Sequence, residues 1–178
     1  GLELPVGTSL PVAFVTSRYA QRYVANKKGE ILPNGAFSYR EALRLTGISK
    51  PGGMLEPERG VWVAEPAVRV IAPRTSFPSV ATGDRKWIDV SIDQQALVAY
   101  VGRRAVYVTL VSTGRGGLGD PETTQATVRG SFMIHHKDVT STMDGEDDSA
   151  ADSYALRDVP FVQYFHKGFA LHGTYWHD

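Results

Sequence analysis

Histidine has the side-chain pKa closest to neutral pH, so the histidines of this chain are the first candidates for proton transfer. His172 ends a short apolar segment, and His177 follows it closely. His135 and His136 are adjacent, so on a strand they would point to opposite faces and could not both bind one metal ion. Taken alone, His172 fits either a general base or a histidine that is hydrogen-bonded inside a folded core.

Other polar clusters predict no metal ion and no cofactor. The sequence has no cysteine, which excludes disulfides and thiolate metal sites. A metal-dependent hydrolase using His135, His172 and His177 is a third-ranked hypothesis, because their spacing matches no common ligand pattern. The acidic residues between 143 and 154 lack the order of a calcium loop and are better explained as a solvated loop. Residues 114–119 are glycine-rich but precede no predicted helix, which favours a flexible loop over a phosphate site.

Charge and hydropathy exclude two broad classes of function. Nineteen basic side chains balance nineteen acidic ones, whereas a dedicated nucleic-acid-binding protein normally has a basic excess. No apolar run reaches the roughly 20 residues that a membrane-spanning helix needs. The sequence starts at Gly1 without an initiator methionine or a signal peptide, so we expect that its start was removed by processing or cloning.

The elements that must position these residues are predicted to be mostly strands. Apolar, β-branched or alternating segments predict strands at residues 11–16, 60–64, 67–72, 86–92, 97–101, 106–111, 131–135, 159–165 and 169–172. A turn at residues 102–104 predicts a hairpin. One short helix is predicted at residues 39–45, with Ser38 as its N-cap and Gly47 as its stop. The long polar stretches 112–129 and 137–158 predict functional or mobile loops.

A boundary near residue 80 is predicted to divide the chain into two domains. Residues 73–84 mix Pro, Ser, Thr and Gly, which is typical of a connecting loop. Residues 1–80 predict a small β-rich module, and residues 81–178 predict most of a larger β domain. The predicted fold class is therefore mainly β.

Residues from about Trp87 to Asp178 carry, in order, the sequence pattern of a known family. Its paired strands, of the form I-x-V-x-L-x-x-Q-x-L-x-x-Y-x-G, match residues 88–102, and its V-S-T-G matches residues 111–114. Residues 127–134 match T-P-x-G-x-F-x-I, except that Val128 replaces the usual proline, which leaves the shape of that turn open. Residues 137–144 and 159–165 continue the match, which ends in L-H-G-T-Y-W-H-D at residues 171–178. With these motifs in this order, the sequence resembles the L,D-transpeptidase (YkuD-type) catalytic domain.

The resemblance implies acyl transfer on peptidoglycan stem peptides. In this family a cysteine thiolate attacks the carbonyl on the L-centre side of an L–D peptide bond, D-alanine leaves, and an amine or water resolves the thioester. His172 matches the base, and Gly173 matches the position whose main-chain carbonyl orients the imidazole. Trp176 matches an aromatic residue beside the cleft. Tyr154 matches, by distance only, a residue of the lid over the donor stem, which residues 137–158 would form.

The family's nucleophile lies in an S-H-G-C motif that follows the catalytic histidine. This sequence matches the family up to its last residue, so we expect the chain to be cut before that motif. The cysteine and the oxyanion hole would then lie beyond Asp178, and the 178 residues alone would be inactive. The alternative is a non-catalytic wall-binding or scaffolding protein that kept the fold and lost the nucleophile.

The resemblance also bears on architecture and location. Residues 1–80 look like a bacterial SH3-like module of the kind that accompanies cell-wall enzymes. Such a module would either bind wall glycan or peptide or support the catalytic domain. The expected fold is this module followed by an L,D-transpeptidase-type β-sandwich that is incomplete at its C-terminus. The expected location is secreted, periplasmic or in the cell wall, with stem peptides as partners and neither nucleic acid nor a membrane span.

Overall fold

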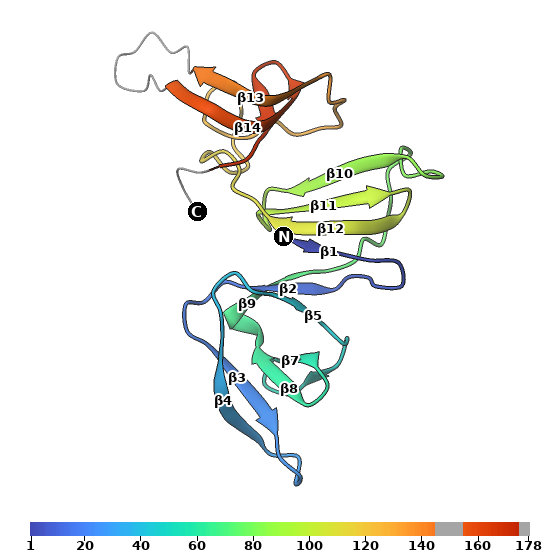
Figure 1. Cartoon of the computed structure of the whole chain (residues 1–178), viewed down its shortest axis with the longest axis vertical. Coiled ribbons are helices and arrows are strands. Elements are labelled where there is room, and N and C mark those ends of the chain that lie inside the picture. Colours follow the sequence, from blue (N-terminus) through green and yellow to red (C-terminus); the bar gives the residue numbers. More distant parts are fainter. Residues whose placement is uncertain (145–154, 175–178) are drawn as a thin grey trace. The chain divides into compact units, whose positions relative to one another are not determined.

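The computed structural model describes residues 1–144 and 155–174 (Figure 1). These residues form antiparallel sheets and one 3-10 turn, Glu65–Ala67 (η1), which confirms the mainly-β fold class. Among them, no helix is long and apolar enough to cross a membrane. The chain divides into two compact units, Gly1–Thr113 and Gly114–Asp178.

The first unit contains three antiparallel sheets. The first has the order β1-β12-β11-β10, formed by Leu2–Glu3 (β1), Arg104–Leu110 (β12), Ala96–Val101 (β11) and Lys86–Ser91 (β10). The second has the order β5-β2-β9, formed by Ala42–Arg44 (β5), Val12–Val15 (β2) and Val68–Ile71 (β9). The third has the order β4-β3-β8-β7-β6, formed by Ile31–Phe37 (β4), Ala20–Ala25 (β3), Val61–Ala64 (β8), Met54–Glu58 (β7) and Ser49–Lys50 (β6).

Strand β2 is buried on both faces because its alternate side chains enter two different cores. Val12 and Phe14 pack into the first core, and Ala13 and Val15 pack into the second. An uninterrupted apolar run of this kind is what a strand covered on both sides requires. The second core continues with residues of β3, β5 and β8, namely Ala20, Leu43 and Val63.

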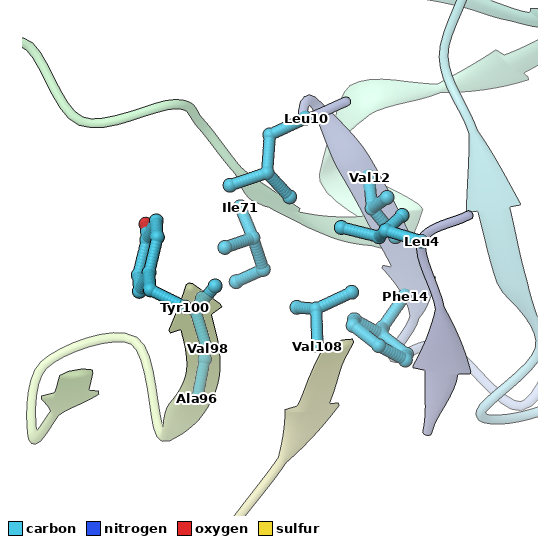
Figure 2. Close-up of a cluster of buried hydrophobic side chains, with 9 residues drawn as sticks. All are labelled: Leu4, Leu10, Val12, Phe14, Ile71, Ala96, Val98, Tyr100 and Val108. Atoms are coloured by element: carbon cyan, nitrogen blue, oxygen red, sulfur yellow. The ribbon is translucent and has the colours of Figure 1, made fainter. Parts of the chain in front are cut away.

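The first core joins residues from both sides of position 80. Figure 2 shows Ala96, Val98, Tyr100 and Val108, from β11 and β12, facing side chains of the first 71 residues, namely Leu4, Leu10, Val12, Phe14 and Ile71. Strand β1 also pairs with β12. Residues 1–80 and the first strands of the predicted second domain therefore share one core, and the boundary near residue 80 stays a prediction.

The predicted hairpin of β11 and β12 is confirmed, with Gly102 and Arg103 in its turn. Gly102 has φ of 56°, and a Cβ at this position would collide with the carbonyl oxygen of Gly83. Glycine is therefore required both by the turn and by the close approach of the chain. Behind the turn, the rings of Trp87 and Tyr100 stack at 4.3 Å between their centroids.

The helix predicted at residues 39–45 is wrong, because β5 occupies residues 42–44 and pairs with β2. The N–H of Ser38 does donate to the Glu41 carboxylate at 2.8 Å, as at a helix start. However, Arg40 has φ of 66°, and its N–H donates to the carbonyl of Val15. Pairing with a buried strand thus outweighs the local helix signal.

The second unit has one described sheet, of order β13-β14-β15, formed by His136–Asp144 (β13), Ala155–His166 (β14) and Phe169–Leu171 (β15). The strands predicted at 159–165 and 169–172 are confirmed. The strand predicted at 131–135 is wrong, because pairing with β14 begins at His136. Met133 is 83% exposed, and Ile134 alone among residues 131–135 is partly buried. The polar stretch 112–129 is a loop as predicted, whereas 137–158 begins and ends as strands.

Candidate active site

His172 stands immediately after β15, the strand that closes the sheet of the second unit. The pairs Gln163–Leu171 and Tyr164–Ala170 fix the end of β15 against β14. The side chain of His172 is exposed, so its imidazole is accessible to solvent and to a substrate. It is not a histidine enclosed in the core, the arrangement that would have opposed a role in proton transfer.

The hydrogen bond of His172 defines which ring nitrogen carries the proton. Its Nδ1 lies 3.0 Å from the carbonyl oxygen of Gly173. A carbonyl oxygen only accepts hydrogen bonds, so Nδ1 must be the donor. In the neutral ring the lone pair is then on Nε2, the atom that would take a proton from a nucleophile. A carboxylate sets the tautomer in the same way in a Ser-His-Asp triad.

Gly173, predicted to orient the imidazole through its main chain, is itself hydrogen-bonded to the sheet. Its N–H donates to the carbonyl oxygen of Pro160 on β14 over 2.8 Å. Sequence reasoning treated Pro160 only as part of the family pattern and missed this contact. A proline inside a run that otherwise reads as a strand was the signal that could have singled it out.

The two predicted substrate contacts, Trp176 and Tyr154, lie outside the described residues. His177 and the acidic residues 145–152 also lie outside them. The cleft aromatic and the lid therefore stay predictions.

The other described histidines of this region make local contacts. His135 and His136 are both exposed, and Nε2 of His136 lies 3.0 Å from the Asp138 carboxylate on the same strand. The main-chain N–H of His135 donates to the carbonyl of Tyr164 at 3.0 Å. In the part of the chain that the structure describes, no three His, Cys, Asp or Glu side chains form a group that could hold a metal ion.

Two further residues of the sequence pattern, Gly114 and Thr127, meet in the second unit. The N–H of Gly114 donates to Oγ1 of Thr127 over 2.8 Å. A Cβ at Gly114 would collide with the carbonyl oxygen of Gln125 and lie 2.9 Å from the nitrogen of Thr127. The glycine of V-S-T-G and the threonine that begins the next motif, Thr127, are thus explained by one close approach of two chain segments.

Comparison with known protein families assigns the C-terminal part of the chain. Residues 85–178, more than half of the sequence, match the profile described as YkuD, the L,D-transpeptidase catalytic domain. The matched residues include β10, β11 and β12 of the first unit and all of the second unit. No curated protein and no solved structure gives a significant match.

Proposed function

The chain belongs to the YkuD family of L,D-transpeptidase catalytic domains, and we propose that it serves as a peptidoglycan L,D-transpeptidase with His172 as the general base. The observation that carries the proposal is the hydrogen bond from Nδ1 of His172 to the carbonyl of Gly173. It places the lone pair of the neutral ring on Nε2, at an exposed position beside the end of a strand.

The base is needed because a thiol with a pKa of about 8.5 is mostly protonated at neutral pH. Nε2 of His172 takes the thiol proton as sulfur bonds to the stem-peptide carbonyl carbon. The protonated imidazole then gives this proton to the nitrogen of D-alanine, the carbon–nitrogen bond breaks, and a thioester remains. An acceptor amine, or water, loses a proton to Nε2 as it attacks the thioester, and the thiol is released.

The nucleophile is assigned to residues encoded after Asp178, because the 178 residues contain no cysteine. A Ser-His-Gly-Cys segment there would supply the thiol and the main-chain N–H groups that bind the oxyanion. Within the proposal, Trp176 borders the cleft and Tyr154 belongs to a lid over the donor stem. The protein would work outside the cytoplasm, in the periplasm or the wall, where its substrate is.

Residues 1–80 are proposed to be an SH3-like module that either binds the wall or supports the catalytic part. The core shared with β11 and β12 favours the supporting role, because the burial of Phe14 and Val12 depends on residues of the family domain.

The absence of cysteine also supports a second candidate, a wall-binding or scaffolding protein that kept the fold. A sedimentation assay with purified peptidoglycan, together with the sequence encoded after Asp178, separates the two. Binding without any downstream cysteine favours the scaffold.

The proposal is tested by mass spectrometry of the chain extended through its encoded C-terminus. After incubation with a tetrapeptide-stem donor, we expect a mass increase on the new cysteine equal to the donor minus D-alanine. Substitution of that cysteine by serine is the control and should abolish the adduct. A donor adduct that persists in the serine variant contradicts the proposed nucleophile.

A further inference from the structure

We propose that Pro160 is the positioning residue of the catalytic histidine: its carbonyl holds Gly173, and its ring dictates that residue 173 is glycine. The inference rests on the proposed role of His172 as the base. It concerns how the imidazole is held, which can be measured independently of catalysis.

The first support is a relay of two hydrogen bonds through one residue. Pro160 accepts the N–H of Gly173 at 2.8 Å, and the carbonyl of Gly173 accepts Nδ1–H of His172 at 3.0 Å. Gly173 lies beyond the last paired residue of β15. The bond to Pro160 therefore ties this residue to the sheet and fixes the carbonyl that faces the imidazole.

The second support is the irregular course of β14 at Pro160. The pairs Gln163–Leu171 and Tyr164–Ala170, if continued, would place Gly173 opposite Phe161. The hydrogen bond goes instead to Pro160, one residue earlier, where Phe161 has φ of 55°. A bulky residue rarely adopts this conformation, so the surrounding structure must impose it.

Proline has no N–H to donate, but its carbonyl remains an acceptor. Pro160 lies in the middle strand of the three, opposite Thr140 on β13. Interior positions of a sheet normally exclude proline. Val159 and Val162, both fully buried, anchor β14 on either side of it. Pro160 is therefore a rigid point from which Gly173 can be held.

The third support is the space around Gly173. An added Cβ would lie 2.9 Å from Cγ of Pro160 and 3.4 Å from its carbonyl oxygen. The φ of Gly173 is not in the left-handed region, so the backbone conformation itself does not demand glycine there. The pyrrolidine ring of Pro160 is the obstacle to a side chain. Alanine at residue 173 must therefore shift away from Pro160 and carry its carbonyl away from the imidazole.

This geometry gives a four-protein test with wild type, Gly173→Ala, Pro160→Ala and the double variant. The readout is the tautomer of His172 from its ring-nitrogen NMR shifts, measured about two pH units above the ordinary imidazole pKa of about 6.5. The His172→Gln spectrum assigns the signals. Wild type and Pro160→Ala, which keeps the carbonyl at residue 160, should hold the proton on Nδ1.

Gly173→Ala should move the proton of His172 toward Nε2. The double variant should restore the proton to Nδ1, because alanine at residue 160 lacks the Cγ that blocks the added methyl group. A general loss of structure would not be repaired by a second substitution. An unchanged tautomer in Gly173→Ala, or a double variant that resembles Gly173→Ala, overturns the inference.

The same four proteins, prepared as extended chains, link the position of His172 to the reaction rate. A displaced base should lower kcat by about 10²-fold in Gly173→Ala, with recovery in the double variant. If the tautomer follows the cycle and the rate does not, the positioning by Pro160 holds and the proposed catalytic role of His172 fails.

Discussion

The side chain of Gln95 holds Thr113 at two points. Its Nε2 donates to Oγ1 of Thr113 over 2.6 Å, and its Oε1 accepts the N–H of Thr113 over 2.8 Å. Nε2 also donates to the carbonyl of Ile92 at 2.6 Å, and the main-chain carbonyl of Gln95 accepts the N–H of Val111 at 2.9 Å. Gln95 thus closes the open end of the β11–β12 hairpin, and it explains why two separate motifs carry glutamine and threonine.

Shortening Gln95 should destabilise the first unit. Gln95 has φ of 46°, a conformation that asparagine tolerates, so Gln95→Asn removes the reach of the side chain with little change in backbone strain. We expect the free energy of unfolding in urea to fall by about 1–3 kcal/mol, because partly buried polar groups lose their partners. Gln94→Asn, at an exposed neighbour, is the matched control and should change stability by less than about 0.5 kcal/mol. Equal effects of the two substitutions would contradict the role of Gln95.

Glu56 should make stability depend on pH in the acid range. Its side chain is 5% exposed and accepts hydrogen bonds from the Gly60 N–H and the Thr46 hydroxyl, each at 2.8 Å. The Gly60 bond first, and then the Thr46 bond, lower the pKa of this carboxyl below its ordinary value of 4.5, and they outweigh the opposing effect of burial. The resulting stabilisation is present above the ordinary pKa and is lost as pH falls through the lowered one.

Glu56→Gln removes this titration. The difference in unfolding free energy between wild type and Glu56→Gln should therefore be largest near neutral pH and shrink as the pH falls below 4.5 and through the lowered pKa. Glu58→Gln, at an exposed site on the same strand, is the control. A difference that stays constant from neutral to acid pH would show that Glu56 does not titrate with a lowered pKa.

The shared core predicts that residues before and after position 80 unfold together. Phe14 is 3% exposed and packs in the same cluster as Val98 and Val108. Phe14→Ala should cost about 3–5 kcal/mol. Fluorescence of Trp62 and of Trp87, each measured with the other tryptophans replaced by phenylalanine, should report one common midpoint shifted by the same amount. Two separate midpoints would instead support independent folding on either side of the predicted boundary.

His172→Gln in the extended chain should lower the rate of D-alanine release by about 10²- to 10⁴-fold, the usual contribution of a general base. His135→Gln is the matched control, because His135 is also exposed and lies in the same unit without a proposed role. The stopped-time assay of released D-alanine should show a loss only for His172→Gln. Similar rates in both variants would remove His172 from the reaction.

Much of the fold could be predicted because strands such as β2, β8 and β9 are apolar, β-branched and bounded by Gly or Pro. The secondary-structure predictions failed where pairing with a strand distant in the sequence decided the local structure. Residues 39–45 carry a helix-start pattern, but β2 needed a partner on that edge. The sequence of β13 is polar, so it predicts a loop. The segment is a strand because it pairs with β14, which also contains the buried residues Val159 and Val162.

The candidate site could be read only in part. The family pattern pointed to His172 and Gly173, since their order and spacing are linear properties of the sequence. The contact between Gly173 and Pro160 depends on an irregular turn of β14 near Phe161, which no periodicity reveals. A proline inside the predicted strand 159–165 marks the position as unusual, but the sequence does not show that its carbonyl accepts the N–H of Gly173.

We propose that this chain carries the base of a cysteine acyltransferase and that the nucleophile is encoded after Asp178. The most direct measurement is release of D-alanine from a purified disaccharide-tetrapeptide by two polypeptides, residues 1–178 and the chain extended through its encoded C-terminus. We expect no release above background by residues 1–178 and catalytic release by the extended chain. Release by residues 1–178 alone, which contain no cysteine, would contradict it.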